Sequence, residues 1–193
     1  MNKTVLKKTI GLILIALGLG ILLSSIALNI RQYISKKNTV DKFQTILNDS
    51  EVTEPTSGNP AVTGDMLYIL RIPAIDSENP VREGVSNSVL ADSLGHQDGT
   101  AYIGENGNCV IAGHRNYTFG KFFNRLDEVE VNDLIYVDTA EDTYTYVVKE
   151  IKVVEPDDVS VLEPTEDKET LTLYTCTPIY IATHRLVITA ERL

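Results

Sequence analysis

Tryptophan is absent from the sequence, and its 193 residues include only two cysteines, three histidines and four phenylalanines. No Cys-x-x-Cys motif and no histidine pair at ligand spacing occurs, so the spacing indicates no zinc site. No glycine-rich phosphate-binding loop is present, which argues against a nucleotide-dependent enzyme. The acidic residues show no calcium-ligand pattern, although they leave calcium dependence open. The sequence therefore predicts a protein without a cofactor.

Basic residues are scarce after residue 42. The first 42 residues hold seven Lys and Arg against one Asp, a net charge of +6. The rest of the chain holds ten basic and 26 acidic residues, a net charge of −16. Because phosphate contacts need a basic face, this part is not expected to bind nucleic acid.

Charge is missing altogether from residues 9–30, a run of 22 residues rich in Leu, Ile, Gly and Ala. As a helix the run would span roughly 33 Å, enough for a bilayer core. A cleavable signal peptide is the alternative, because Ser25-Ile26-Ala27 offers small residues at a suitable spacing, but the run is longer than a usual signal core. We therefore expect a signal-anchor at 9–30, a cytoplasmic end at 1–8, and a single-pass protein of the plasma membrane.

Residues 31–64 are expected to form a stalk and a flexible linker. Apolar residues at a loose helical spacing run to residue 47, and Pro and Gly then gather among acidic and hydroxyl residues. The folded domain is expected over residues 65–193, outside the cell.

This domain is predicted to be all-β. Short alternating or apolar runs are separated by Gly, Pro, Asn and Asp clusters, a pattern typical of a closed or nearly closed sheet. Two short helices are expected, at 87–94 with Ser86 as the cap and at 119–126. The eight expected strands cover residues 66–72, 80–83, 99–103, 108–113, 134–138, 144–154, 171–175 and 185–191.

The strand at 171–175 leads into Cys176. Its alternation places the cysteine on the same face as Thr172 and Tyr174. Pro178 has no N–H to continue a ladder, so the strand should end there and expose the thiol at a sheet rim. Cys109, by contrast, opens an apolar run, and we interpret it as a packing residue, with a disulfide to Cys176 as the alternative.

Two other strand ends offer partners for this thiol. An apolar strand ends at His114, while His96 lies in a glycine-flanked loop that could also lie near the site. Arg185 opens the last strand, and because adjacent strand residues face opposite ways, His184 should face away if Arg185 faces the thiol. A thiol, an imidazole and a guanidinium supply the nucleophile, the acid for a leaving amine and the fixed cation that acyl transfer through a thioester needs.

These motifs resemble those of the sortases, the cysteine transpeptidases of Gram-positive cell surfaces, over about residues 65–193. The motifs, in the family's order, are Ala112-Gly113-His114, then Thr172-Leu173-Tyr174-Thr175-Cys176, then Arg185. The resemblance implies an eight-stranded β-barrel with short helices. It also implies that Cys176 is the nucleophile, His114 the general acid and base, and Arg185 the residue that stabilises the oxyanion and the substrate. Thr175 is expected to add a hydroxyl or backbone contact to the substrate.

The resemblance further implies cleavage of a Leu-Pro-x-Thr-Gly-type sorting signal between Thr and Gly, followed by transfer of the acyl group to an amine. The amine, from a cell-wall peptide or a pilin lysine, stays open. The Cys-Thr-Pro and Thr-His-Arg-Leu phrases resemble the pilin-polymerising class (class C or D), whereas the lack of an Asp-Pro-aromatic lid motif and of a C-terminal membrane segment fits wall-anchoring classes. Two alternatives remain: a cysteine endopeptidase that uses water, and a non-catalytic surface binding module with a Cys109–Cys176 disulfide.

Overall fold

The computed structural model describes residues 11–27, 30, 34, 45, 66–115 and 122–193. The chain divides into two compact units, 1–41 and 42–193. In the first unit, residues 11–27 form an α-helix. Among the described residues, no helix combines the length and the apolar character needed to cross a membrane. The expected anchor at 9–30 reaches past this helix into residues outside the description, as does nearly all of the expected stalk and linker at 31–64, so both stay predictions.

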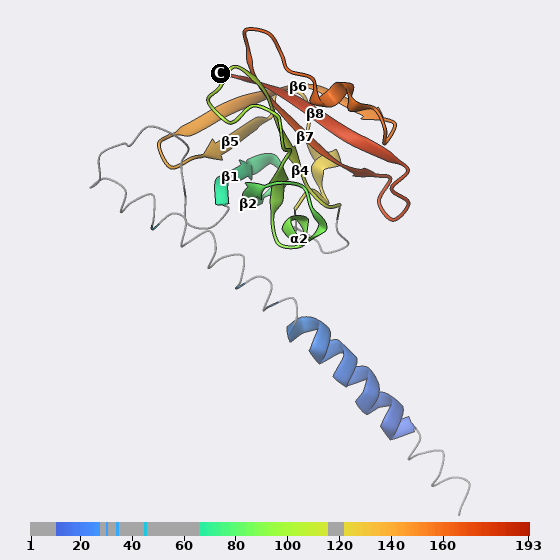
Figure 1. Cartoon of the computed structure of the whole chain (residues 1–193). Helices are drawn as coiled ribbons and strands as arrows, with labels where there is room; N and C mark the ends of the chain where they lie inside the picture. Colours follow the sequence, from blue (N-terminus) through green and yellow to red (C-terminus); the bar gives the residue numbers. More distant parts are fainter. Residues whose placement is uncertain (1–10, 28–29, 31–33, 35–44, 46–65, 116–121) are drawn as a thin grey trace, which may run out of the picture. The chain divides into compact units, whose positions relative to one another are not determined.

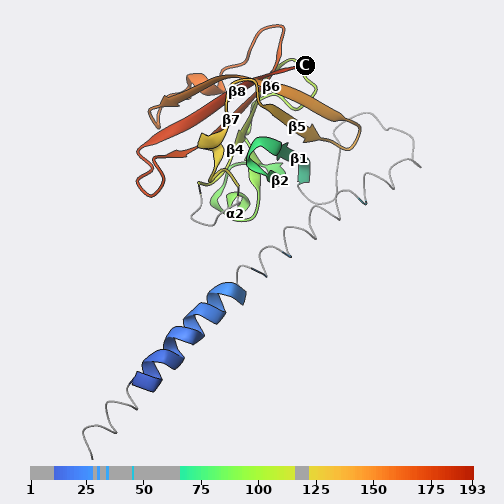
Figure 2. The ribbon, with the colours of Figure 1, turned by 180° about the vertical axis from the view of Figure 1, so that it is seen from behind.

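Over the described residues from 66 onward, the second unit is a closed β-barrel of eight strands (Figures 1 and 2). Around the barrel the order is β1-β2-β3-β4-β7-β8-β6-β5. Among the pairs, β2–β3 and β4–β7 are parallel and the others antiparallel. The strands are β1 (Met66–Ile72), β2 (Ser77–Glu83), β3 (Leu94–His96), β4 (Gly107–Ala112), β5 (Leu134–Asp138), β6 (Thr143–Val154), β7 (Glu169–Thr177) and β8 (His184–Arg192).

Short helical turns connect the strands. They are α2 (Asn87–Leu90) and the 3-10 turns η2 (Pro73–Ile75), η3 (Leu126–Glu128) and η4 (Val159–Leu162). The hydroxyl of Ser86 accepts a hydrogen bond from Val89 N at 3.4 Å, which satisfies one of the free N–H groups at the start of α2.

Alternate strand residues fill the barrel interior. On β7, Leu171 and Leu173 are fully buried, and on β8 so is Ile188. Each buried side chain of this size stabilises the fold by about 1.5–3 kcal/mol. The alternate residues of β7, which are Thr172, Tyr174 and Cys176, point to the outer face of the barrel wall. The inner face therefore holds the fold together, and the outer face of the same strand can carry chemistry.

The expected eight-stranded barrel is confirmed, and two details of the prediction are wrong. Residues 99–103 form no strand; β3 (Leu94–His96) takes that place in the sheet, and it also shortens the helix expected at 87–94 to four residues. Of the helix expected at 119–126, the described residues 122–125 form turns, with η3 following, and the rest lies outside the described residues.

Candidate active site

The parallel pairing of β4 with β7 brings His114 and Cys176 to the same end of the barrel. Ala112 lies opposite Tyr174, and the two candidate residues each stand two positions further along. Because side chains alternate in a strand, two residues that follow a matched pair by two positions share one face of the sheet. We call this end of the barrel, where β4 and β7 finish and β8 begins, the catalytic end.

Arg185 lies directly opposite Cys176 in the antiparallel pair of β7 and β8. Directly opposed residues have Cβ atoms about 4.5–5.5 Å apart, so the guanidinium and the thiol share one patch of the outer face. Arg185 Nη1 donates to His184 O at 3.0 Å and to Ala182 O at 3.4 Å. Within the described part of the chain, its Nε and Nη2 groups make no hydrogen bond, and they remain available for a substrate oxygen.

Tyr174 lies on the face that carries Cys176. Its hydroxyl donates to Gln97 Oε1 at 3.0 Å. Burial raises the pKa of Tyr174, the Arg185 guanidinium opposes this rise, and the nearby Cys176 adds to it. The phenol therefore stays neutral beside the thiol, where it is a fixed part of the site surface.

Gly113 holds the end of β4 against β7, immediately before His114. Its N–H donates to Tyr174 O at 3.1 Å, and its carbonyl accepts from the Thr175 hydroxyl at 2.7 Å. A Cβ atom at this position would lie 2.5 Å from a ring carbon of Phe123 and 2.6 Å from a methyl carbon of Leu94. The glycine in the Ala-Gly-His motif thus lets the backbone pack closely where the imidazole is placed.

The structure places the side chain of Thr175 differently from the sequence expectation. Thr175 is 1% exposed and faces inward, with its hydroxyl donated to Gly113 O. The hydroxyl is therefore not presented to a substrate; it ties β7 to the residue before His114. The alternative part of the expectation, a backbone contact to the substrate, stays a prediction.

Cys109 lies in the core and cannot reach Cys176. It is opposite Leu171, five positions before Cys176, a separation of about 16 Å along a strand, whereas a disulfide needs Cα atoms about 4.4–6.8 Å apart. Both cysteines are free thiols. Burial raises the pKa of the Cys109 thiol. The alternative of a Cys109–Cys176 disulfide is therefore wrong for this fold.

Neither of the other two histidines shares the face of the sheet that carries the Cys176 thiol. His96 is 1% exposed in β3; its Nε2 donates to Ala101 O at 3.0 Å, and its Nδ1 lies 3.1 Å from Glu83 Oε2. These contacts give His96 a structural role, because its ring connects β3 to Glu83 of β2 and to the segment at Ala101. His184 lies opposite Thr177, next to the Cys176–Arg185 pair, so it faces the other way, as expected.

One charged residue of the catalytic end was missed by the sequence reasoning. Arg115 follows His114 directly, and its side chain is only 7% exposed. It contacts Thr177, the residue that follows Cys176. The motif Ala-Gly-His gave no signal for this contact, because the partner lies 62 positions further along the chain.

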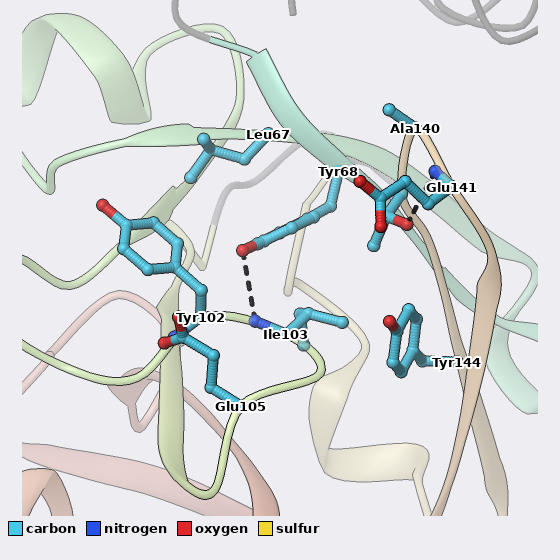
Figure 3. A pocket seen from close by; sticks show the side chains of 9 residues that line it. Leu67, Tyr68, Tyr102, Ile103, Glu105, Ala140, Glu141 and Tyr144 are labelled. Atoms are coloured by element: carbon cyan, nitrogen blue, oxygen red, sulfur yellow. Dashed lines mark hydrogen bonds between the residues drawn. The ribbon is translucent and has the colours of Figure 1, made fainter. Parts of the chain in front are cut away.

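Figure 3 shows a pocket of about 240 Å³ in close-up. It lies at the opposite end of the barrel from Cys176, where β6 begins and β8 ends. Its lining includes Tyr68, whose hydroxyl accepts from Ile103 N at 3.2 Å, and Tyr144. The guanidinium of Arg192 lies 4.7 Å from the centre of the Tyr144 ring, and Arg192 is seven positions, roughly 23 Å, along β8 from Arg185. This pocket is therefore separate from the catalytic end. Among the described residues, no group of His, Cys, Asp and Glu side chains is arranged to hold a metal ion.

Comparison with known proteins gives one consistent family. Residues 70–193 match the family model of the sortase domain. The chain is 35% identical over 133 residues to a sortase D of Bacillus subtilis (strain 168), covering 67% of this chain and 65% of that protein. The structure of a Clostridium perfringens sortase D5 transpeptidase is similar, with a TM-score of 0.67 and 30% identity over 82% of this chain and 98% of that one. A Streptococcus pneumoniae sortase C, described in connection with catalysis and pilin substrate specificity, has a TM-score of 0.65 and 30% identity over 74% of this chain and 76% of that one.

The matched residues include all three strands that position the candidate site. The family model begins within β1 and runs through β4, β7 and β8, which place His114, Cys176 and Arg185. The aligned part spans just under two thirds of the Bacillus relative. The fold, the order of the motifs and the family match agree, and the chain belongs to the sortase family.

Proposed function

We propose that this protein is a cysteine transpeptidase that cleaves a Leu-Pro-x-Thr-Gly-type sorting signal between Thr and Gly and transfers the acyl group to an amine. The observation that carries the proposal is the register that sets Cys176 opposite Arg185, with His114 at the end of the adjoining strand. Family membership supports the same chemistry, since a relative of similar structure is described as a transpeptidase.

In the first half-reaction, the thiolate Sγ of Cys176 attacks the carbonyl carbon of the substrate threonine. A carbon–sulfur bond forms, and negative charge develops on the carbonyl oxygen, which the N–H groups of Arg185 stabilise. As the peptide carbon–nitrogen bond breaks, the His114 imidazolium donates its proton to the departing glycine amine. The product is a thioester on Cys176 and a free amine.

In the second half-reaction, an acceptor amine attacks the thioester carbon and gives its proton to His114. The new carbon–nitrogen bond forms, the carbon–sulfur bond breaks, and Cys176 returns as the thiolate. Arg185 again stabilises the oxyanion. Water in place of the amine would make the same residues a cysteine endopeptidase, so the acceptor decides between the two activities.

The acceptor and the cellular setting are part of the proposal. A cell-wall peptide amine and a pilin lysine are the two acceptors to compare, and the likeness to a sortase C described for pilin substrate specificity justifies including the second. We also propose that residues 9–30 anchor the chain in the plasma membrane with the barrel outside, based on the uncharged 22-residue run. Separating membranes from the soluble fraction, with and without residues 1–41, tests the anchor.

The activity is tested by incubating the purified protein with a Leu-Pro-x-Thr-Gly-type peptide, with and without an added amine. Mass spectrometry should find an acyl adduct on Cys176, which passes to the amine when one is supplied. Cys176→Ala should abolish the adduct, whereas Cys109→Ala, the matched control, should retain it. Release of the acid at equal rate with and without amine would indicate the endopeptidase. A folded protein with a free Cys176 thiol and no adduct from any such peptide would overturn the proposal.

A further inference from the structure

The catalytic end contains a buried charge to which the proposed chemistry assigns no role. The Arg115 side chain is 7% exposed. Its Nη1 donates to Thr177 Oγ1 at 2.8 Å, and its Nη2 lies 2.7 Å from Asp127 Oδ2 in η3. A desolvated guanidinium is unfavourable unless its donors are paired, so this fork is held in a defined geometry.

The Thr177 contact joins the two catalytic segments at an informative point. Arg115 is the residue after His114, and Thr177 is the residue after Cys176. Among the described residues, the last backbone hydrogen bond between β4 and β7 runs from Gly113 to Tyr174, before either catalytic residue. Beyond that bond, the Arg115–Thr177 hydrogen bond is the lateral tie that continues the strand pairing past His114 and Cys176.

The Asp127 contact fixes the same guanidinium from the other side. Asp127 is about half exposed, so it supplies a counter-charge that remains partly hydrated while the arginine is buried. The Nε atom of Arg115 is buried and has no hydrogen-bond partner among the residues that the structure describes. An unpaired buried N–H is destabilising, so stability alone does not account for this arrangement. The paired donors, on Thr177 and Asp127, point to a role in holding the geometry of the catalytic end.

We propose that Arg115 is a positioning residue, which fixes the separation of His114 from Cys176 by bridging Asp127 and Thr177. The inference rests on the proposed transpeptidase function. The described contacts of Arg115 are with Thr177 and Asp127, and they include neither Cys176 nor His114. It acts on the two segments that carry them, and a planar fork with two diverging donors is required, so lysine cannot replace it.

The test compares Arg115→Lys, which keeps the charge, with Thr177→Val, which keeps the branched shape but removes the acceptor. Each variant should slow formation of the Cys176 acyl-enzyme about ten- to 100-fold, because small displacements of reacting groups have effects of that size. The peptide KM should change little, since the proposed role of both residues is to hold His114 and Cys176 in place and not to bind the peptide. The double variant should be no slower than the slower single variant, because both changes remove one interaction.

A second readout does not depend on the peptide. The rate of Cys176 alkylation by iodoacetamide at pH 7 reports the surroundings of the thiol, and it should change in both variants, because His114 no longer lies at its native distance from the thiol. A changed alkylation rate in the variants, with no peptide adduct in the unchanged protein, would count against the proposed substrate and leave the Arg115 inference standing.

The matched control is Arg71→Lys. Arg71 forms a bidentate pair with Asp138 between β1 and β5, with both distances at 2.7 Å, away from the catalytic end. This variant should lower the urea midpoint without altering the acylation rate or the alkylation rate. If Thr177→Val and Arg115→Lys likewise change only the midpoint, with the acylation and alkylation rates preserved, the positioning role is overturned.

Discussion

Cys109 and Cys176 lie on neighbouring parallel strands, β4 and β7, yet they face opposite sides of the barrel wall. Cys109 is 2% exposed opposite Leu171 in the core, whereas Cys176 lies opposite Arg185 at a strand end. Burial raises the pKa of Cys109, which keeps it a neutral packing group. A cysteine side chain is thus a core packing group at position 109 and a candidate nucleophile at position 176. The difference comes from the face of the sheet on which each lies and from its position along the strand.

The surroundings of the two thiols differ in the same sense. Around Cys109 the neighbours are apolar side chains such as Ile111 and Leu173, which gain stability by excluding water. Around Cys176 they are Arg185, Tyr174 and the end of β4 with His114. A single layer of β-sheet therefore separates the apolar core, which stabilises the fold, from the outer face, which carries the candidate active site. We call these the core region and the site region. Four substitutions or measurements test how independent the two regions are.

The largest effect is expected at the cation opposite the thiol. Arg185→Lys keeps the charge but loses the fork of N–H donors, and it should reduce the acylation rate by about 100-fold, the size found when an oxyanion donor is removed. Stability should be nearly unchanged, because Arg185 is partly exposed and its bonds are to two neighbouring carbonyls, of His184 at the start of β8 and of Ala182 in the loop before it. Single-turnover acylation and urea unfolding measure the two quantities. An unaltered acylation rate would show that the guanidinium does not stabilise the oxyanion.

Gly113→Ala should affect both regions at once, lowering both the stability of the fold and the acylation rate. The added Cβ would meet Phe123 and Leu94, both fully buried, so overpacking should destabilise the fold by about 1–3 kcal/mol. Because the next residue is His114, acylation should fall as well. Adding Phe123→Leu makes room beside the new methyl group and should restore part of both losses. If stability drops while acylation in the folded fraction is normal, the position of the imidazole does not depend on this close packing.

Cys109→Ser should affect the core region alone. A serine hydroxyl is more polar than the thiol, and burying it at this 2% exposed position is destabilising by about 1–3 kcal/mol. Acylation by the folded protein at 25 °C should stay the same, because Cys109 lies on the inner face and far from the strand end. Cys109→Ala, which buries no polar group, is the control and should lose less. A slower acylation in Cys109→Ser alone would show that the core and the site are coupled.

The last and smallest expected effect concerns the reactivity of Cys109 in the folded protein, which should be undetectable. In the native protein, iodoacetamide should label one thiol per chain between pH 6 and 9, and two after denaturation, because the raised pKa of Cys109 keeps that group protonated. The same shift bears on stability: the folded state holds this proton more tightly than the unfolded state, so its contribution is full below the unfolded pKa of about 8.5 and declines above it. Two labelled thiols at pH 7 in the native protein would contradict the assignment of Cys109 to the core.

Much of the barrel could be predicted from the sequence, because most of its strands are long enough to show a period. The strands at 66–72 and 134–138 are placed as expected, and the strand before Cys176 ends before Pro178. The strand patterns also predicted that His114, Cys176 and Arg185 stand at strand ends, and the register brings these ends together. These features depend on local alternation and on residues that stop a strand, and both are visible in a single sequence.

The strand β3 could not be found in this way. It has three residues with a glycine in the middle, too few for a period. The run at 99–103 looks like a strand, yet its carbonyl at Ala101 accepts from buried His96, and its Tyr102 ring stacks on that imidazole at 4.8 Å. A side chain from a neighbouring strand thus takes the place of a ladder partner. The contact of Arg115 with Thr177 escaped for a similar reason, since only the folded barrel brings the two together.

The pairing of β4 with β7 also determines when the site comes into existence during folding. Their contact closes a chain loop of about 60 residues, from Ala112 to Tyr174, whereas β7 and β8 form a short antiparallel hairpin that sets Arg185 opposite Cys176. Pairings between distant segments form slowly, because the entropy of closing the loop is lost before the contacts are gained. The nucleophile and the cation come from the hairpin, and the acid joins them only when β4 pairs with β7. We therefore expect a chain that lacks the β4–β7 pairing to be inactive.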